Sequence, residues 1–208
     1  MNTRVVMFLT EKEKMCAHVL YDANFDPDLA EERANCKILC LKYNTELPYD
    51  DFEARNELLG RILGGMGNVV HIEPPFWCDY GRYIHIGSNF YANHGLVILD
   101  AGGVVFGDYV FIGPNCGFHT SGHPLDAERR NAGLEYAWPI TVGNNVWFGA
   151  AVQVMPGVTI GDNSVIGAGS VVTKDIPAFS LAVGNPCRVI RELSQKDFER
   201  NWSYKKRL

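Results

Sequence analysis

His123 is the residue of this sequence best suited to proton transfer near neutral pH. It begins a polar segment, 123–136, which cannot supply buried aliphatic residues at a regular spacing. We expect this segment to project as a loop, and long loops on a regular scaffold often carry functional groups. An imidazole can act as a general base at this pH, and Glu135 is a possible partner for it. His123 and Glu135 therefore form the first candidate catalytic pair.

The composition limits the classes of protein to which the chain can belong. It has 208 residues, of which 47% are hydrophobic and 21% are charged, which fits one folded domain with a small appendage. The net charge of −5 disfavours binding to a nucleic-acid backbone or an anionic membrane. The apolar run Val5–Leu9 is too short for a signal peptide or a membrane span, so we expect a cytoplasmic protein.

The six cysteines show no spacing typical of a metal site. They contain no C-x-x-C pair, and in a cytoplasmic chain we expect reduced thiols that serve as small apolar residues. The sequence therefore predicts neither disulfides nor a cysteine-bound metal.

Helices are expected at both ends of the chain. Each segment combines a capping residue or an acidic first turn with apolar residues at helical spacing. The expected helices, with the residues that recur at helical spacing, are Thr10–Leu20 (Met15, Val19, Leu20), Asp26–Asn44 (Leu29, Arg33, Cys36, Cys40, Tyr43), Asp50–Leu63, and Ser194–Tyr204 (Phe198, Trp202).

Between these helices the sequence repeats every six residues. Six unbroken hexads begin at Val142, each starts with Val, Ile or Phe, and four carry Gly second. The same register appears upstream at Phe106 and Ile112, and it is shifted by two residues at Ile86, which implies an insertion near Asp100–Gly103. An antiparallel sandwich has period two and would not keep this phase. The period predicts a mainly β fold, a parallel β-helix with three hexads per coil and Gly or Asn at its corners.

Several motifs identify a family resemblance over nearly the whole chain. They are TEKEKM…LYD (10–22), CDYG (78–81), NFYAN (89–93), TSGHP (120–124), PITVGNNVWFGA (139–150), PGVTIGDNSVIGAGSVVTKDIP (156–177) and GNPCRVIRE (184–192). They resemble the maltose and galactoside O-acetyltransferases, which are hexapeptide-repeat enzymes. Asp79 and Ala101 resemble the maltose type more closely, since galactoside-type members tend to carry Ser and an acidic residue there.

The resemblance implies a left-handed β-helix that works as a homotrimer with acetyl-CoA as co-substrate and no metal. It divides the chain into a helical segment, 1–66, that contributes to the acceptor site, a β-helix, 67–190, with a loop at about 123–136, and a C-terminal helix and tail, 191–208. Each site would lie between neighbouring subunits.

The resemblance also assigns roles to individual residues. His123 would take a proton from a sugar hydroxyl that attacks the acetyl thioester, and Asn93 would hold the tetrahedral intermediate, with Glu135 as a possible further catalytic residue. The implied acceptor-binding residues are Asp22, Arg33, Asp79, Tyr91 and Asn93. The implied cofactor-binding residues are Trp147, Gly149, Ala150, Ala168, Thr173, Lys174, Arg188 and Arg191.

Three other functions remain open on the sequence alone. The acceptor could be a hydroxyl compound other than a sugar. His94, His119 and His123 could bind zinc, as three histidines do in γ-class carbonic anhydrases. The repeat alone would also permit a scaffold without catalytic activity.

Overall fold

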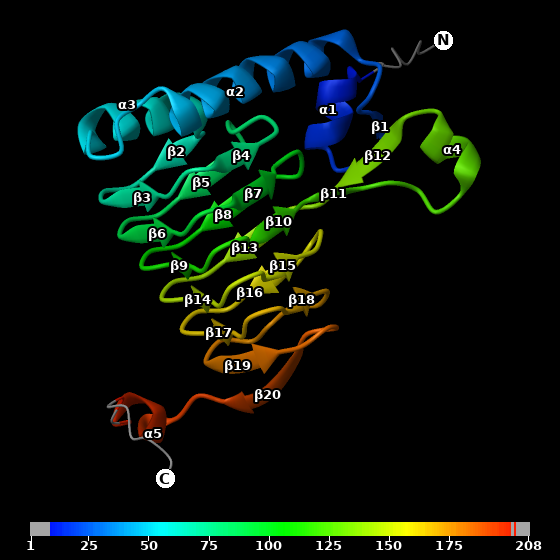
Figure 1. Cartoon of the computed structure of the whole chain (residues 1–208). Coiled ribbons are helices and arrows are strands. Elements are labelled where there is room, and N and C mark those ends of the chain that lie inside the picture. The colour runs from blue at the N-terminus through cyan, green and yellow to red at the C-terminus, as the bar shows by residue number, and fades with distance from the viewer. Residues whose placement is uncertain (1–8, 201, 203–208) are drawn as a thin grey trace, which may run out of the picture.

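The strands of this protein stack into a three-sided coil with helices across one end (Figure 1). The structure is a computed structural model, which describes residues 9–200 and Trp202. Successive strands pass from one face of the coil to the next, and each strand pairs in parallel with the strand one coil further along.

Each face of the coil is one parallel sheet. The first face contains β2 (Gly65–Met66), β5 (Ile84–Ile86), β8 (Val104–Phe106), β13 (Ile140–Val142) and β16 (Thr159–Ile160). The second face contains β4 (Phe76–Cys78), β7 (Leu96–Leu99), β10 (Gly117–His119), β15 (Gln153–Val154) and β18 (Val171–Val172). The third face contains β3 (Val70–Ile72), β6 (Phe90–Ala92), β9 (Phe111–Ile112), β14 (Trp147–Phe148), β17 (Val165–Ile166) and β19 (Ser180–Val183), and β20 (Arg188–Glu192) folds back antiparallel to β19.

The strand register confirms the period of six. Val142 lies opposite Ile160, 18 residues further along the chain, which is one coil of three hexads. Ile86 instead lies opposite Phe106, 20 residues along, because the turn before β8 contains two additional residues. The first residue of every hexad from Val142 onward is buried, with at most 2% of its surface exposed. Burying such an aliphatic column is the main stabilising contribution to the coil.

The corner residues differ from the expectation in one respect. The fourth position of the hexads adopts the left-handed backbone conformation, as at Asn145, Ala151 and Asn163. Glycine at the second position has another cause, because a Cβ on Gly149 would lie 2.6 Å from the backbone nitrogen of Ala168 in the next coil. The second-position glycines therefore let the coils pack closely, whereas the fourth position carries the turn.

Three N-terminal helices form as expected, with one shorter than predicted. They are α1 (Glu11–Cys16), capped by Thr10 and Glu13, α2 (Pro27–Thr45) and α3 (Phe52–Ile62). Helix α1 ends before Val19 because His18 adopts a positive φ of 58°. Helices α2 and α3 pack across the first coil and bury Cys40, Tyr43 and Leu59 there.

The C-terminal helix is also shorter than expected. Helix α5 covers Gln195–Phe198, and Trp202 lies outside it. Residues 201 and 203–204 of the predicted helix lie outside the described residues. No helix in the described part of the chain is both long enough and apolar enough to cross a membrane.

The segment that begins at His123 projects from the coil (Figure 1). It is more ordered than the predicted loop, because β11 (Ser121–Gly122) and β12 (Leu134–Ala137) form a hairpin around α4 (Ala127–Asn131). Strand β1 (Tyr21–Asp22) pairs antiparallel with β12. This pairing brings the N-terminal segment against the root of the hairpin.

Candidate active site

A hollow of about 420 Å³ lies between α2, the β1–β12–β11 sheet and the turns that follow β4 and β7. We call it the acceptor hollow. Four segments that are far apart in the sequence form its walls, and they contribute charged side chains of both signs. Its lining residues are Tyr21, Ala23, Asn24, Arg33, Lys37, Asp79, Tyr80, Leu99, Ala101, Ser121, Gly122, His123 and Glu135.

The imidazole of His123 is held by the hairpin from which it projects. Its Nδ1 lies 3.1 Å from the backbone oxygen of Leu134, and a carbonyl can only accept, so Nδ1 donates. In the neutral ring this contact leaves the lone pair on Nε2. The side chain is 44% exposed, so Nε2 can be reached by a ligand.

Glu135 lies beside this ring, deeper in the hollow. Its Oε1 is 3.6 Å from His123 Nε2, and its Oε2 accepts a hydrogen bond from the Tyr21 hydroxyl at 3.3 Å. Burial raises the pKa of the Glu135 carboxyl, and the nearby His123 opposes this shift. At 3.6 Å the carboxylate can stabilise an imidazolium by charge without blocking Nε2 through a hydrogen bond.

Arg33 and Asp79 lie on the opposite wall. Arg33 donates a 2.7 Å hydrogen bond to the Tyr80 hydroxyl, and Asp79 lies 3.5 Å from the ammonium of Lys37. Both residues line the hollow, as the resemblance implies. Lys37 and Tyr80 were not predicted, since only their packing against Arg33 and Asp79 shows that they belong to this wall.

Asp100 is a further residue that sequence reasoning missed. It is fully buried, and its Oδ1 accepts hydrogen bonds from the backbone N–H groups of Asp79 and Tyr80 at 3.0 and 2.8 Å. Its Oδ2 has no partner among the described residues, and burial raises the pKa of the Asp100 carboxyl to about 6. The sequence feature that could have revealed Asp100 is its position directly after the aliphatic run Leu96–Leu99.

Asp22 is placed at the margin of the hollow rather than in its lining. Its Oδ1 accepts hydrogen bonds from the N–H groups of Asn24 and Phe25 at 3.1 and 2.9 Å, which fixes the turn before α2. This turn positions Ala23 and Asn24, which do line the hollow.

Tyr91 and Asn93 lie elsewhere in the chain. With Trp147 they line a second hollow of about 440 Å³ on the third face of the coil, together with Phe111, Ile112 and Gly113. We call it the face hollow. Within one chain the structure therefore separates Tyr91 and Asn93 from His123.

Beside the face hollow, a row of small residues follows one corner of the coil. Each corner residue donates a backbone hydrogen bond of 2.8–2.9 Å to the strand end of the next coil; the pairs are Asn93 to Ile112, Gly113 to Phe148, Gly149 to Ile166, and Gly167 to Ala182. Ala150 and Ala168 follow Gly149 and Gly167 in the chain, and we call this row of small corner residues the track. Arg188 lies at the far end of the track, since it pairs with Val183 at the end of β19.

The remaining predicted cofactor residues are not all on this track. Thr173 and Lys174 follow β18 and are exposed at the corner between the second and first faces, from which the hairpin of His123 also projects. Arg191 already forms a two-pronged ion pair with Asp197, at 2.6 and 2.7 Å. The predicted cofactor residues are thus divided between two corners of one chain.

The three-histidine zinc site is not formed within the chain. His94 Nδ1 contacts the backbone oxygen of Pro74 at 2.6 Å, and His119 Nε2 contacts Gln153 at 2.7 Å. Across residues 9–200 no group of three potential metal ligands includes a histidine. The zinc hypothesis therefore lacks its ligand set in this chain.

Comparison with known proteins agrees with this architecture. Residues 14–67 match the maltose acetyltransferase hexapeptide capping motif, and residues 139–174 match the bacterial transferase hexapeptide repeat. The galactoside O-acetyltransferase of Escherichia coli is 49% identical, with 81% of this chain and 83% of that protein covered. A putative acetyltransferase of Saccharomyces cerevisiae is 56% identical over 86% of this chain and 90% of its own length.

Solved structures give the same result. A maltose O-acetyltransferase from Clostridium difficile superposes with a TM-score of 0.86 at 47% identity, covering 90% of this chain and 99% of its own. A galactoside acetyltransferase in complex with coenzyme A superposes with a TM-score of 0.89 at 43% identity, covering 96% of this chain and 98% of its own. The fold and the site thus define an acetyltransferase on a left-handed β-helix of hexapeptide repeats. The chain belongs to the maltose and galactoside O-acetyltransferase family.

Proposed function

We propose that this enzyme transfers the acetyl group of acetyl-CoA to a hydroxyl of a sugar bound in the acceptor hollow. The observation that carries the proposal is the contact of His123 Nδ1 with the Leu134 carbonyl, because it leaves Nε2 free to accept a proton beside the hollow. The helical segment 1–66 contributes Arg33 and Lys37, and the carboxylates Asp79 and Glu135 complete a lining suited to hydroxyl groups.

The proton transfer follows from this arrangement. His123 Nε2 removes the hydroxyl proton as the oxygen attacks the acetyl carbonyl carbon, and an imidazolium forms. The carboxylate of Glu135, at 3.6 Å, stabilises that charge. When the tetrahedral intermediate collapses, the proton passes from Nε2 to the departing thiolate, so that CoA leaves as the free thiol.

We further propose that the acceptor hollow of one subunit meets the face hollow of a neighbour in a homotrimer. Asn93 of the neighbouring subunit would then donate to the oxyanion, and its track of glycines would hold the pantetheine arm. The division of the predicted cofactor residues between two corners supports this arrangement, since a cofactor between subunits would contact a different corner of each. Arg188 and Lys174 would supply cations for the CoA phosphates.

Acceptor assays test the proposal. The purified enzyme is incubated with acetyl-CoA and a panel of maltose, glucose, galactosides and non-sugar alcohols, while free CoA is measured with a thiol reagent and the product by mass. We expect sugar-dependent CoA release that His123→Ala abolishes. Acetylation of non-sugar alcohols alone would contradict the sugar assignment and leave the transferase mechanism intact.

A further inference from the structure

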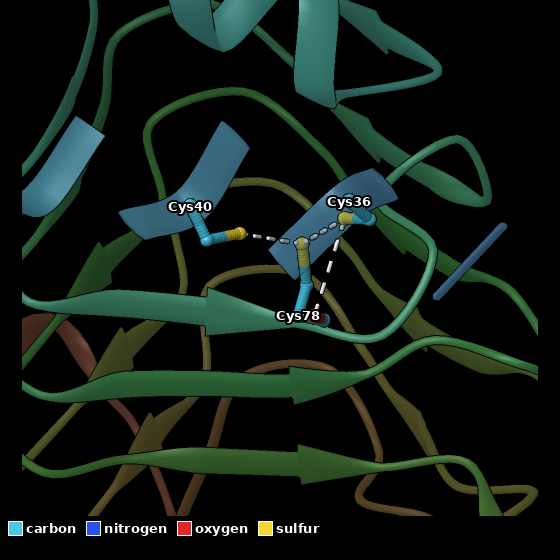
Figure 2. Close-up of side chains that lie close together, drawn as sticks. All are labelled: Cys36, Cys40 and Cys78. Atoms are coloured by element: carbon cyan, nitrogen blue, oxygen red, sulfur yellow. Dashed lines mark hydrogen bonds between the residues drawn. The ribbon is translucent and has the colours of Figure 1, made fainter. Parts of the chain in front are cut away.

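Three cysteine sulfurs converge where α2 crosses the coil (Figure 2). Cys36 and Cys40 lie one helical turn apart on α2, and Cys78 is the last residue of β4. The Sγ atom of Cys78 lies 3.5 Å from that of Cys36 and 3.6 Å from that of Cys40. All three sulfurs lie within 4.8 Å of one another, and all three residues are at most 5% exposed.

This cluster differs from the other buried cysteines of the chain. Cys116 is equally buried, but its thiol donates to the backbone oxygen of Gly149 at 3.2 Å, in the manner of an isolated packing residue. The cysteines of the cluster instead direct their thiols to one point from two different elements. The sequence predicted scattered thiols, and the spacing of Cys36 and Cys40 on one helical face could not reveal that Cys78 joins them.

We propose that Cys36, Cys40 and Cys78 bind one copper(I) ion through three sulfur ligands. Soft sulfur ligands select copper(I) or zinc among the common cations. A structural zinc site is closed by four protein ligands, whereas within the described part of the chain only three potential ligand atoms meet here. A three-sulfur set suits copper(I), which accepts fewer ligands than zinc.

The geometry requires only a small adjustment. A metal–sulfur distance of about 2.3 Å in a trigonal plane places the sulfurs about 4 Å apart. The separations of Cys78 Sγ from the other two sulfurs, 3.5 and 3.6 Å, are a few tenths of an ångström shorter, and the Cys36–Cys40 separation is at most 4.8 Å, so side-chain rotation can supply the change. Cys36 also lines a surface hollow of about 230 Å³ beside Arg61 and Tyr80, which gives the ion a path to the cluster.

The bound ion would connect two walls of the acceptor hollow. Lys37 follows Cys36 in α2, and Asp79 follows Cys78 after β4, and both of these neighbours line that hollow. Binding at the cluster would therefore fix α2 to β4 directly behind Lys37 and Asp79. This site is independent of the proposed acceptor and can be tested without an activity assay.

The test is an anaerobic competition for copper(I) between the purified full chain and the coloured chelator bathocuproine disulfonate. We expect the wild type to retain one copper(I) per chain. Cys40→Ser should lower the affinity at least tenfold, whereas the matched variant Cys116→Ser, which also alters one buried thiol, should retain the wild-type value. X-ray absorption of the loaded protein should count three sulfur neighbours.

A second variant, which keeps the cluster and removes the other thiols, keeps the test valid if Cys40→Ser fails to fold. The triple variant Cys16→Ser/Cys116→Ser/Cys187→Ser leaves the cluster as the only thiols and should still bind one ion. Loss of binding in this variant, no retention by the wild type, or a count of two sulfurs would overturn the proposal. Zinc(II) held more tightly than copper(I), as judged with a zinc-selective chelator, would also overturn it.

Discussion

The helical end of the molecule and its coiled body position their side chains in different ways. In the body, each strand is fixed by the strand one coil further along, which lies 18 residues away from β13 to β18, and the interior aliphatic column repeats with it. At the helical end, the acceptor hollow combines α2 and the β1–β12–β11 sheet, which lie outside the repeat, with the turns that follow β4 and β7. The body therefore supplies a uniform track, and the helical end supplies a varied set of charged groups.

This difference indicates where specificity and common chemistry reside. Under the proposed function, the glycines and alanines of the track contact only the narrow pantetheine arm, so they would not select the acceptor. The acceptor hollow, with His123, Glu135, Arg33 and Asp79, would hold the groups that discriminate between hydroxyl compounds. Five experiments test this division of labour between the helical end and the body.

The largest effect is expected from removing the base at the helical end. His123→Ala should lower turnover about a hundredfold or more, the usual scale for general-base catalysis, because the variant loses the Nε2 lone pair that accepts the hydroxyl proton in the proposed mechanism. Steady-state kinetics measure turnover, and the binding of acetyl-CoA, followed by thermal shift, should change little. Near-normal turnover would remove His123 from the mechanism.

Mixing chains that lack His123 with chains that lack Asn93 should restore part of the activity. If each site joins His123 of one subunit to Asn93 of the next, co-expressed His123→Ala and Asn93→Ala chains form mixed trimers in which about one site in four keeps both residues. We expect about a quarter of the wild-type activity from the mixture, although each variant alone is nearly inactive. A mixture as inactive as its components would show that both residues act within one chain.

Asp100, at the seam between the two regions, should make stability depend on pH. Its folded pKa is raised from 3.8 to about 6, so its protonated form stabilises the fold at low pH and that contribution, about 3 kcal/mol, is lost as pH rises through about 6. The melting temperature of Asp100→Asn relative to wild type should therefore rise between pH 4 and pH 7.5. A difference that does not vary with pH would mean that this carboxyl titrates normally.

Within the body, the coils pack so closely that adding a single methyl group between them should destabilise the fold. A Cβ on Gly161 would overlap the backbone nitrogen of Ala178 in the next coil. Gly161→Ala should lower the free energy of unfolding by about 1–3 kcal/mol, the usual cost of overpacking, as measured by denaturant titration. Gly60→Ala is the control, because nothing lies within 4 Å of its Cβ position.

The smallest expected effect is a gain in stability, opposite in sign to the loss expected for Gly161→Ala. Ala151 adopts a left-handed conformation with φ of 58° at the fourth position of its hexad, where most related hexads carry Asn or Gly. Ala151→Gly relieves about 1–2 kcal/mol of strain but loses about 0.5–1 kcal/mol to greater freedom of the unfolded chain. We expect a gain below about 1 kcal/mol in the same titration, and a loss would mean that the corner is not strained.

The sequence could predict the body because its physics is local and repeated. One buried aliphatic residue per hexad is enough to set the register, and the period alone was sufficient to locate the shift of two residues at Ile86. Helix ends were harder, since the positive φ of His18 that ends α1 has no signal in the sequence pattern.

The acceptor hollow could be predicted only in part. His123 and Glu135 stand out because they lie in a segment that breaks the repeat, and the family motifs pointed to Arg33 and Asp79. Lys37, Tyr80 and Asp100 reach the same wall through packing between α2 and two separate turns, which no period or spacing encodes. The separation of Asn93 from His123 in one chain is equally a property of the three-dimensional coil.

The antiparallel return of β20 has a consequence for assembly. A parallel stack that ended at β19 would offer its free backbone groups to another copy, and end-to-end growth of this kind produces fibres. Instead, β20 covers the end of this face, and its own outer edge carries the charged residues Arg188, Arg191 and Glu192, all exposed. Helices α2 and α3 cover the opposite end of the coil, so each end carries an element that hinders the stacking of another copy.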